Sequence, residues 1–524
     1  MIPKINGNET IREEMAVLPN PLTVQNEFSD TATAAFRERM GRKGFQVTAA
    51  DGGFLRIRKQ EAMEKEAYFL SVRRERIEIE AADETGVIWA LTTLLKKINP
   101  DGSVQAGMIQ DAPKFRHRGL HLDVARHFFS AGEVERILEQ ISLAKMNVLH
   151  WHLADDQGWR IESKKYPKLH TCSGQYYTQE EIREVVAFAR TRGVEVIPEI
   201  DLPGHTRGIL AAYPEYSCSG RTVKLAKAGG IYRVIFCAGA EKTYAFLEEL
   251  LEEVCPLFPS ERFHIGGDEA PKAEWQECPV CAARMAEQKL TRYEDLQGYF
   301  SVRVAEILKK YGKRPILWND SLESALLPEN MQMQYWSVTY NEPSAAWMKR
   351  GGQWIYSDMF EMYLDYPHAM ISVKKLYENR IDLGSCPYDE GMEPYGYEAC
   401  IWTEQIRTKE ELEQHLFPRV LVLAELAWYG AGDYEEFEER LKEEMEEVKK
   451  AGISVTAFEE WNPEGERRQR EAFGYLAAMH AGLAEAEKGE VVDPSDVGED
   501  FQKKFIGRFF EPEDLPVLMG NPKA

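Results

Sequence analysis

Apolar and polar positions divide the chain into three stretches with different patterns. In residues 1–112, alternation of apolar and charged residues in Arg76–Glu80 is typical of a half-exposed strand. The segment from Val87 to Leu95 has helical spacing and ends in two lysines, as helix C-termini often do. Short strands are also expected at Phe45–Val47, Tyr68–Val72 and Ile77–Ile79. Residues 1–112 are therefore predicted to form a small α+β domain.

Between residues 113 and 450, short apolar segments alternate with amphipathic ones. Eight strands are expected, at His117–Ala125, Val148–Asp155, Val194–Asp201, Arg262–Glu269, Arg314–Asp320, Met331–Trp336, Trp354–Asp358 and Tyr397–Glu404. Helices are expected at Gly132–Lys145, after a capping box of Thr178 and Glu181, at Tyr293–Lys310 and at Glu410–Trp428. This pattern predicts an α/β fold, a (β/α)8 TIM barrel. A doubly wound open sheet is the alternative, and it is weakened because no Gly-rich phosphate loop follows any strand.

Residues 451–524 are polar, with helical stretches at Phe473–Ala486 and Asp500–Phe509, and are expected to form a helical C-terminal region. The Glu-rich run Tyr434–Lys449 is typical of a solvated helix face.

Composition narrows the choice of partners. The 524 residues include 64 Lys and Arg and 87 Asp and Glu, so the formal net charge is −23. Such a surface repels phosphate backbones and anionic lipids, so neither nucleic acid nor a membrane is expected as a partner. No apolar run is long enough for a spanning helix, and Met1–Asn6 lacks the pattern of a signal peptide. We therefore expect a cytoplasmic protein whose eight cysteines are mostly reduced thiols; its oligomeric state is not predicted.

Carboxylates, histidines and tryptophans gather where the expected strands end. The strand-end sequences are 150–156 (HWHLADD), 198–205 (PEIDLPGH), 264–269 (HIGGDE), 317–320 (LWND) and 400–404 (CIWTE). In a TIM barrel these ends lie together at the catalytic face, so they predict a polar, aromatic-lined pocket. Indole rings stack on the apolar faces of sugars, and Trp318, Trp336 and Trp402 are candidates for that role. The alternative is that these three rings close the barrel as core.

Asp268 and Glu269 are adjacent on one strand, and their side chains are expected to diverge. A conventional retaining glycosidase holds its acid and its nucleophile about 5 Å apart, usually on different strands. One residue of this pair could therefore serve as the acid and the other as a supporting carboxylate. The nucleophile would then come from another part of the protein or from the substrate itself.

In its ordered motifs the chain resembles glycoside hydrolase family 20, the β-N-acetylhexosaminidases. The resemblance runs from the N-terminal domain to Trp428 and leaves residues 451–524 uncovered. Its strongest matches are residues 122–128 (LDVARHF), 150–159 (HWHLADDQGW), 264–269 (HIGGDE), 363–365 (YLD), 402–404 (WTE) and 418–428 (PRVLVLAELAW).

The resemblance implies exo-acting, retaining hydrolysis of terminal β-linked N-acetylglucosamine (GlcNAc) or N-acetylgalactosamine (GalNAc), with a small oligosaccharide or glycoconjugate as substrate. The 2-acetamido oxygen would attack C1 and form an oxazolinium ion. Among the catalytic residues, Glu269 would serve as acid and then base, Asp268 would orient the amide, and Tyr363 would donate to its oxygen. The implied sugar-binding residues are Arg126, Trp318, Trp336, Asp365, Trp402 and Glu404, and Asp155 and His205 would support Glu269.

Other interpretations stay open at this point. His150 and His152 could ligate zinc in a metal-dependent barrel hydrolase, and a catalytically silent amino-sugar-binding protein is a further alternative. Cys278 and Cys281 have metal-ligand spacing, but no second cysteine pair is near them in sequence, so a plain loop is favoured. No metal and no cofactor is expected.

The sequence departs from the family pattern in one place. The family often carries a Trp between the Tyr-Leu-Asp and Trp-Thr-Glu motifs, and here no Trp occurs between Trp354 and Trp402. Either Tyr388, Tyr395 or Tyr397 takes its place, or the site is more open.

Overall fold

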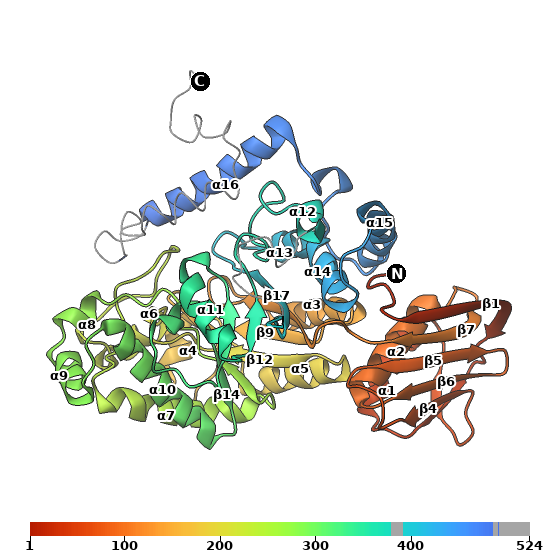
Figure 1. Ribbon diagram of the computed structural model, residues 1–524, viewed down its shortest axis with the longest axis horizontal. Coiled ribbons are helices and arrows are strands. Elements are labelled where there is room, and N and C mark those ends of the chain that lie inside the picture. The colour runs from red at the N-terminus through yellow and green to blue at the C-terminus, as the bar shows by residue number, and fades with distance from the viewer. Residues whose placement is uncertain (379–390, 486–490, 492–524) are drawn as a thin grey trace.

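The computed structural model describes residues 1–378, 391–485 and 491, and its centre is a closed barrel of eight parallel strands (Figure 1). The strands are β8 (His117–Asp123), β9 (Val148–His152), β12 (Glu195–Glu199), β13 (Arg262–His264), β14 (Arg314–Trp318), β15 (Gln332–Tyr335), β16 (Trp354–Tyr356) and β17 (Gly396–Ile401). The predicted TIM barrel is confirmed, and all eight expected strands are present. Each ends before its expected last residue, because the polar strand-end residues turn out of the ladder into loops.

Register fixes which strand ends meet. β8 closes the barrel by pairing with β17 on one side, where Leu122 lies opposite Ile401, and with β9 on the other, where Asp123 lies opposite His152. Parallel pairing brings all carboxyl ends to one face of the barrel, so residues from distant parts of the sequence lie there together.

Helices surround the barrel and occupy its loops. They are α3 (Ala131–Leu143), α4 (Lys168–Ser173), α5 (Gln179–Thr191), α6 (Arg207–Leu210), α7 (Glu241–Val254), α8 (Ala273–Glu277), α9 (Pro279–Gln288), α10 (Tyr293–Lys310), α11 (Asn341–Lys349), α12 (Val373–Glu378), α13 (Lys409–Leu416) and α14 (Arg419–Trp428). A short hairpin of β10 (Ala154–Asp155) and β11 (Gly158–Trp159) follows β9. The capping box of Thr178 and Glu181 opens α5 as predicted.

One expected helix is wrong. The stretch Glu410–Trp428 forms two helices, α13 and α14, that meet at Phe417 and Pro418. Proline has no backbone N–H and its ring excludes the preceding turn, so α13 ends before it.

The N-terminal domain is a seven-stranded sheet covered by two helices, α1 (Thr31–Arg42) and α2 (Glu84–Lys97), which pack on each other. The strand order is β1 (Asn8–Val17), β7 (Ser103–Asp111), β5 (Tyr68–Arg73), β6 (Arg76–Ala81), β4 (Leu55–Lys59), β2 (Leu22–Asn26) and β3 (Val47–Ala49). The expected strands at 68–72 and 77–79 are confirmed, whereas the one expected at Phe45–Val47 begins only at Val47. Trp89 of α2 packs edge-on against Trp428 of α14, with ring centroids 6.3 Å apart, and joins this domain to the barrel.

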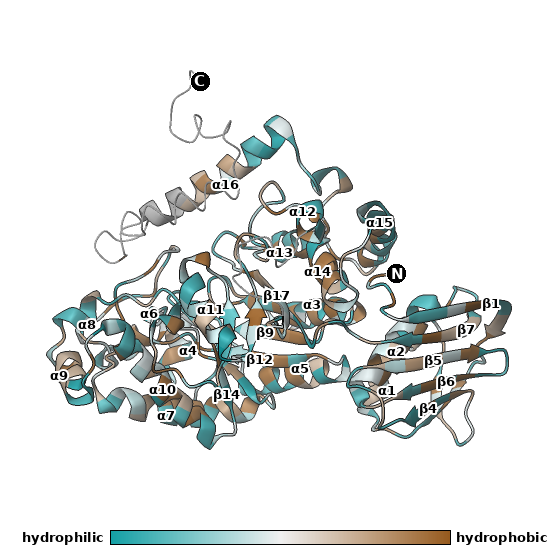
Figure 2. Cartoon of the chain, in the orientation of Figure 1, coloured by the Kyte–Doolittle hydropathy of each residue, from teal (hydrophilic) through white to brown (hydrophobic). Residues whose placement is uncertain are grey.

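Two further helices follow the barrel. Helix α15 (Tyr434–Lys450) buries Phe437, Leu441, Met445 and Val448 on one face, and its acidic residues give it a mostly hydrophilic colour in Figure 2. Helix α16 (Gly465–Glu485) contains most of the predicted stretch at 473–486, and it lies above the barrel in Figure 1. The stretch expected at Asp500–Phe509 lies outside the described residues. Within the described part of the chain, no helix has the length and hydropathy needed to cross a membrane.

Candidate active site

The turn after β13 presents the carboxylate pair Asp268 and Glu269 at the catalytic face of the barrel. Gly266 and Gly267 have φ angles of 64° and 100°, and a Cβ added to Gly266 would lie 1.7 Å from Oδ1 of Asp201. Glycine is therefore required at position 266. Glu269 itself has a φ of 46°, a conformation that costs a non-glycine residue energy and is concentrated at functional sites.

His205 connects this pair to a second group of carboxylates. Its Nε2 atom lies 3.4 Å from Glu269 Oε2 and 3.8 Å from Asp268 Oδ2, and its Nδ1 atom lies 3.3 Å from Asp155 Oδ1 and 3.4 Å from Asp156 Oδ2. Burial works to lower the pKa of His205, but the surrounding carboxylates outweigh it and raise that pKa well above the ordinary value. The imidazolium is thus held between four carboxylates, two of which are exposed toward solvent.

Arg126 follows β8 and is fixed by the same network. Its Nη2 atom lies 2.8 Å from Asp155 Oδ2 and 3.7 Å from Glu404 Oε1, and its Nη1 atom lies 3.2 Å from Asp123 Oδ2. Burial opposes ionisation of Asp155, yet Arg126 and His205 hold the pKa of Asp155 well below its usual range. The guanidinium also lies over the ring of Trp402, 4.9 Å from its centroid. Arg126 is therefore held rigidly at the edge of the site.

Aromatic side chains close around the carboxylates. Trp336 and Tyr363 are nearly parallel with ring centroids 6.4 Å apart, and Trp402 lies 6.1 Å from Tyr363 and 5.9 Å from Trp318. Trp318 is only 1% exposed and donates its indole N–H to Glu199 Oε1 at 3.0 Å. Trp318 therefore forms the floor of the site, and for this residue the alternative of a core role holds in part. Trp336 and Trp402, by contrast, are half-buried.

The carboxylates differ in how readily they ionise. Burial, reinforced by Glu269 and opposed by His205, raises the pKa of Asp268 to about 6. Burial and the charge of Asp268 raise the pKa of Asp320 to about 8; this residue accepts hydrogen bonds from the Trp336 indole and from the Glu269 backbone N–H, the latter at 3.2 Å. Environments that separate the pKa values of neighbouring carboxyl groups are typical of acid–base sites.

Asp365 and Glu404 lie on the far side of the site, and a third residue joins them. Burial and the neighbouring Glu404 raise the pKa of Asp365 to about 8. The hydroxyl of Tyr475, on α16, lies 3.4 Å from Asp365 Oδ2, and its ring packs edge-on against Tyr366 with centroids 5.5 Å apart. Helix α16 thus reaches the site, although sequence reasoning assigned it no part there.

Residues that contact the site but were not predicted include Asp123, Asp156, Asp201, Asp320 and Tyr475. The four aspartates stand inside motifs that the sequence analysis quoted, and their position at the expected strand ends was the available signal. Tyr475 lies in a region with no motif, so no sequence signal pointed to it.

The histidines beneath the site are the residues that would bind the metal if the protein were a metal-dependent hydrolase. His150, His152 and His264 gather around Glu199 in groups whose donor atoms are close enough to hold an ion. His152, however, uses both ring nitrogens for carboxylates, Nδ1 for Glu199 and Nε2 for Asp155 at 2.8 Å. His150 likewise lies 3.1 Å from Glu199 and 2.8 Å from Glu398 through its two nitrogens. A metal ligand must offer a free lone pair, so this arrangement favours a hydrogen-bonded network.

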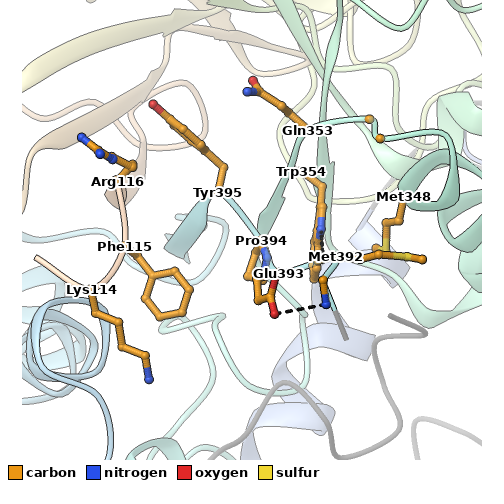
Figure 3. Close-up of a pocket in the computed structure, with 13 residues that line it drawn as sticks. Lys114, Phe115, Arg116, Met348, Gln353, Trp354, Met392, Glu393, Pro394 and Tyr395 are labelled. Carbon is orange, nitrogen blue, oxygen red and sulfur yellow. Dashed lines mark hydrogen bonds between the residues drawn. The ribbon is translucent and has the colours of Figure 1, made fainter. Parts of the chain in front are cut away.

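Two of the three tyrosines suggested as substitutes for a pocket Trp, Tyr395 and Tyr397, do not reach the site. Tyr388 lies outside the described residues. Tyr395 precedes β17 and Tyr397 is its second residue, so both lie at the opposite end of the barrel from Trp402. Tyr395 lines a cavity of about 520 Å³ there, together with Phe115, Arg116 and Trp354 (Figure 3). For Tyr395 and Tyr397 the expectation is wrong, because residues at the start and the end of a parallel strand lie at opposite barrel faces.

Comparisons with known proteins agree with this geometry. The family model described as glycosyl hydrolase family 20, catalytic domain, matches residues 115–431, and the model for domain 2 of that family matches residues 2–112. The β-hexosaminidase of Porphyromonas gingivalis is 33% identical over 412 residues, which cover 72% of this chain and 53% of that protein, so the chain spans about half the length of this relative. The β-hexosaminidase of Vibrio furnissii is 31% identical over 81% of this chain and 76% of its own.

Solved structures are similar along most of the chain. The β-N-acetylhexosaminidase of Bacteroides fragilis superimposes with a TM-score of 0.80 at 29% identity, covering 87% of this chain and 96% of its own. An exo-β-N-acetylglucosaminidase of Vibrio harveyi, solved in complex with N-acetylglucosamine, superimposes with a TM-score of 0.79 at 28% identity, covering 87% of this chain and 78% of its own. The chain belongs to glycosyl hydrolase family 20, so the glycoside hydrolase class expected from its sequence is confirmed at the level of the family.

Proposed function

We propose that this protein is an exo-acting, retaining β-N-acetylhexosaminidase that removes terminal β-linked GlcNAc or GalNAc from small oligosaccharides or glycoconjugates by substrate-assisted catalysis. The observation that carries the proposal is the pair Asp268 and Glu269 on one strained turn, with His205 within 3.4 Å of Glu269 and 3.8 Å of Asp268. Two adjacent carboxylates cannot stand on opposite faces of one glycosidic bond, so the nucleophile is assigned to the 2-acetamido oxygen of the sugar.

In this mechanism Glu269 protonates the departing glycosidic oxygen and later takes a proton from the attacking water. Its side chain is 35% exposed, more than that of Asp268 at 13%, as suits a group that meets both the leaving group and water. The bond from C1 to the leaving oxygen breaks as the acetamido oxygen forms its own bond to C1, and the charge moves onto the oxazolinium ring.

Asp268 accepts the acetamido N–H and stabilises the positive charge that develops on the ring. Tyr363 donates to the acetamido oxygen and holds it near C1, and Trp336 and Trp402 enclose the group between them. Proximity of this kind lowers a barrier by as much as ~7–11 kcal/mol in well-oriented systems.

Arg126, Asp365 and Glu404 form the polar side of the site and are assigned to the sugar hydroxyls. Arg126 donates to the hydroxyls on C3 and C4, and the two carboxylates accept from those on C4 and C6. GlcNAc and GalNAc differ only at C4, where all three side chains can serve either epimer, so both sugars are included.

The test compares an aryl β-N-acetylglucosaminide with the aryl β-glucoside that lacks the acetamido group. We expect hydrolysis of the first and almost none of the second, because the glucoside has no internal nucleophile. Comparable rates on both would contradict the mechanism. Activity that is lost on chelation while the Tm stays unchanged would instead support a metal-dependent hydrolase, and binding of GlcNAc without any hydrolysis would support a silent sugar-binding protein.

A further inference from the structure

Four cysteines converge from two separate loops, each of which also carries residues of the candidate active site. Cys218 and Cys237 lie in the loop after β12, and Cys278 and Cys281 lie in the loop after β13, at the junction of α8 and α9. All four are free cysteines, and their sulfurs lie within 4.8 Å of one another. Cys237, Cys278 and Cys281 are buried, with exposed fractions of 5% or less.

The spacing of the sulfurs matches a tetrahedron around one ion. The measured Sγ–Sγ distances are 3.7 Å for Cys218 and Cys281, 3.8 Å for Cys237 and Cys281, and 3.9 Å for Cys237 and Cys278. A zinc–sulfur distance of about 2.3 Å places the corners of a regular tetrahedron about 3.8 Å apart. The separations are nearly twice the ~2.05 Å of a disulfide bond.

The backbone around the sulfurs is built to bring them together. Ser217 and Phe236 form an isolated antiparallel bridge, and the Cys237 N–H donates to the Tyr216 carbonyl at 2.9 Å, so each of the first two cysteines directly follows a residue of this bridge. Cys278 and Cys281 are separated by two residues, and Cys281 lies in the first turn of α9, where the helix dipole favours thiolates.

The two loops also touch through groups other than the cysteines. The Trp275 indole donates to the Phe236 carbonyl at 2.8 Å, and Arg284 donates to the Gly239 carbonyl at 3.2 and 3.3 Å. A Cβ added to Gly239 would lie 2.3 Å from the Val280 carbonyl oxygen, so the backbones approach as closely as glycine allows. These contacts hold the four sulfurs in place without any bond among them.

We propose that Cys218, Cys237, Cys278 and Cys281 form a structural tetrathiolate site for one Zn²⁺ ion that fastens the loop after β12 to the loop after β13. Binding releases the thiol protons to solvent, and no oxidant or reductant is involved. All four positions are taken by cysteine sulfur, which leaves no open position for substrate, as in structural zinc sites.

The place of the zinc site in the fold links it to the catalytic residues. The loop after β12 also carries His205, and the turn after β13 carries Asp268 and Glu269, so the ion joins the outer parts of the two segments whose inner parts meet at His205 and Glu269. In Figure 1, α8 and α9 lie together at the end of the molecule furthest from the N-terminal sheet. The ion positions catalytic groups and takes no part in the reaction.

The first experiment uses the full-length chain, purified without a polyhistidine tag. We expect elemental analysis to find about one zinc per chain, and a mercurial reagent to release that zinc into a metallochromic dye as it titrates the thiols. Replacement by Co²⁺ should give the sulfur-to-cobalt charge-transfer bands and intense visible bands of a tetrahedral thiolate site. A chain that contains no zinc, and whose cluster cysteines react in the folded state as free thiols, would overturn the proposal; iron in place of zinc would overturn the assignment of the metal.

Variants separate the site from general effects of cysteine removal. Cys278→Ala and Cys281→Ala should lose the zinc and lower the Tm, with a fall in kcat larger than any change in KM. Cys255→Ala, which removes a buried cysteine outside the cluster, should keep one zinc. If the cluster variants fail to fold, the zinc content and cobalt spectrum of the unaltered chain still decide the question. Retention of zinc by both cluster variants would contradict the proposal, and the zinc content, the cobalt spectrum and the Tm do not depend on the identity of the sugar substrate.

Discussion

The loops after β12 and β13 carry two clusters of opposite character. At the inner end, Glu269 has a left-handed backbone conformation, and like charges are held close together beside solvent. At the outer end, four cysteines, three of them buried, lie close together where a tight glycine contact and ordinary hydrogen bonds bring the backbones together. The inner cluster stores strain and electrostatic repulsion that chemistry can use, and the outer one supplies the stability that lets those features persist.

This comparison separates residues that carry the reaction from residues that hold the loops. Substitutions at the inner cluster should change rates and pH profiles while the Tm and the metal content stay nearly unchanged. Substitutions at the outer cluster should change the metal content first.

The largest effect is expected for Glu269→Gln. Loss of the acid and base should lower kcat on natural glycosides by about 10²- to 10⁴-fold, with a smaller loss on aryl substrates whose leaving groups need little protonation. Steady-state kinetics on both substrate types measures this. An equal loss on both would contradict the acid role, and a large fall in Tm would place Glu269 among the structural residues.

Tyr363→Phe should have the next largest effect. Its hydroxyl is assigned to the acetamido oxygen as charge develops, and removal of one such donor lowers kcat by about 10²- to 10³-fold. The comparison with Tyr366→Phe, a neighbouring buried tyrosine 6.1 Å away, controls for loss of a buried hydroxyl. Similar kinetics for the two variants would contradict a specific role for Tyr363.

A smaller effect is expected for Tyr475→Phe. Its 3.4 Å contact with Asp365 is a weak hydrogen bond at the hydroxyl side of the site, so KM should rise about 2- to 10-fold while kcat changes little. Kinetics of the full chain measures both constants. An unchanged KM would show that α16 does not contribute to sugar binding.

The smallest effect concerns stability and its dependence on pH. Because the folded-state pKa of Asp268 is about 6, against 3.8 for an ordinary aspartate, its ionisation lowers stability as the pH rises through that window. Asp268→Asn should therefore raise the Tm by about 1–3 °C at pH 7–8 and leave it unchanged at pH 4, where the folded wild type is already neutral. The same ionisation predicts that wild-type activity falls as the pH drops below about 6. A Tm gain that is equal at both pH values would contradict this account.

The barrel was predictable because each of its strands is a short apolar run followed by polar residues, and parallel pairing then brings those ends together. The break between α13 and α14 was missed because the apolar periodicity continues across Pro418, although proline itself was the signal. In the N-terminal domain β1 was not predicted, because most of its residues are exposed and show no alternation.

The cysteine cluster shows the limit of reading motifs along a chain. Cys278 and Cys281 gave a clear spacing, but their partners lie about 40 and 60 residues earlier, after a different strand. Only the packing of two loops makes them neighbours. Tyr475 was hidden for the same reason, since nothing in its own segment indicates that α16 lies against Asp365.

The most direct test of the account measures how the rate depends on the nucleophilicity of the substrate's own amide. In a series of aryl β-glycosides, the N-acetyl group is replaced by mono-, di- and trifluoroacetyl groups, each of which withdraws more electron density from the carbonyl oxygen. If that oxygen attacks C1, kcat/KM should fall steeply and steadily along the series. A rate that does not change with fluorination would mean that an enzyme side chain or a water molecule is the nucleophile, and the account would be wrong.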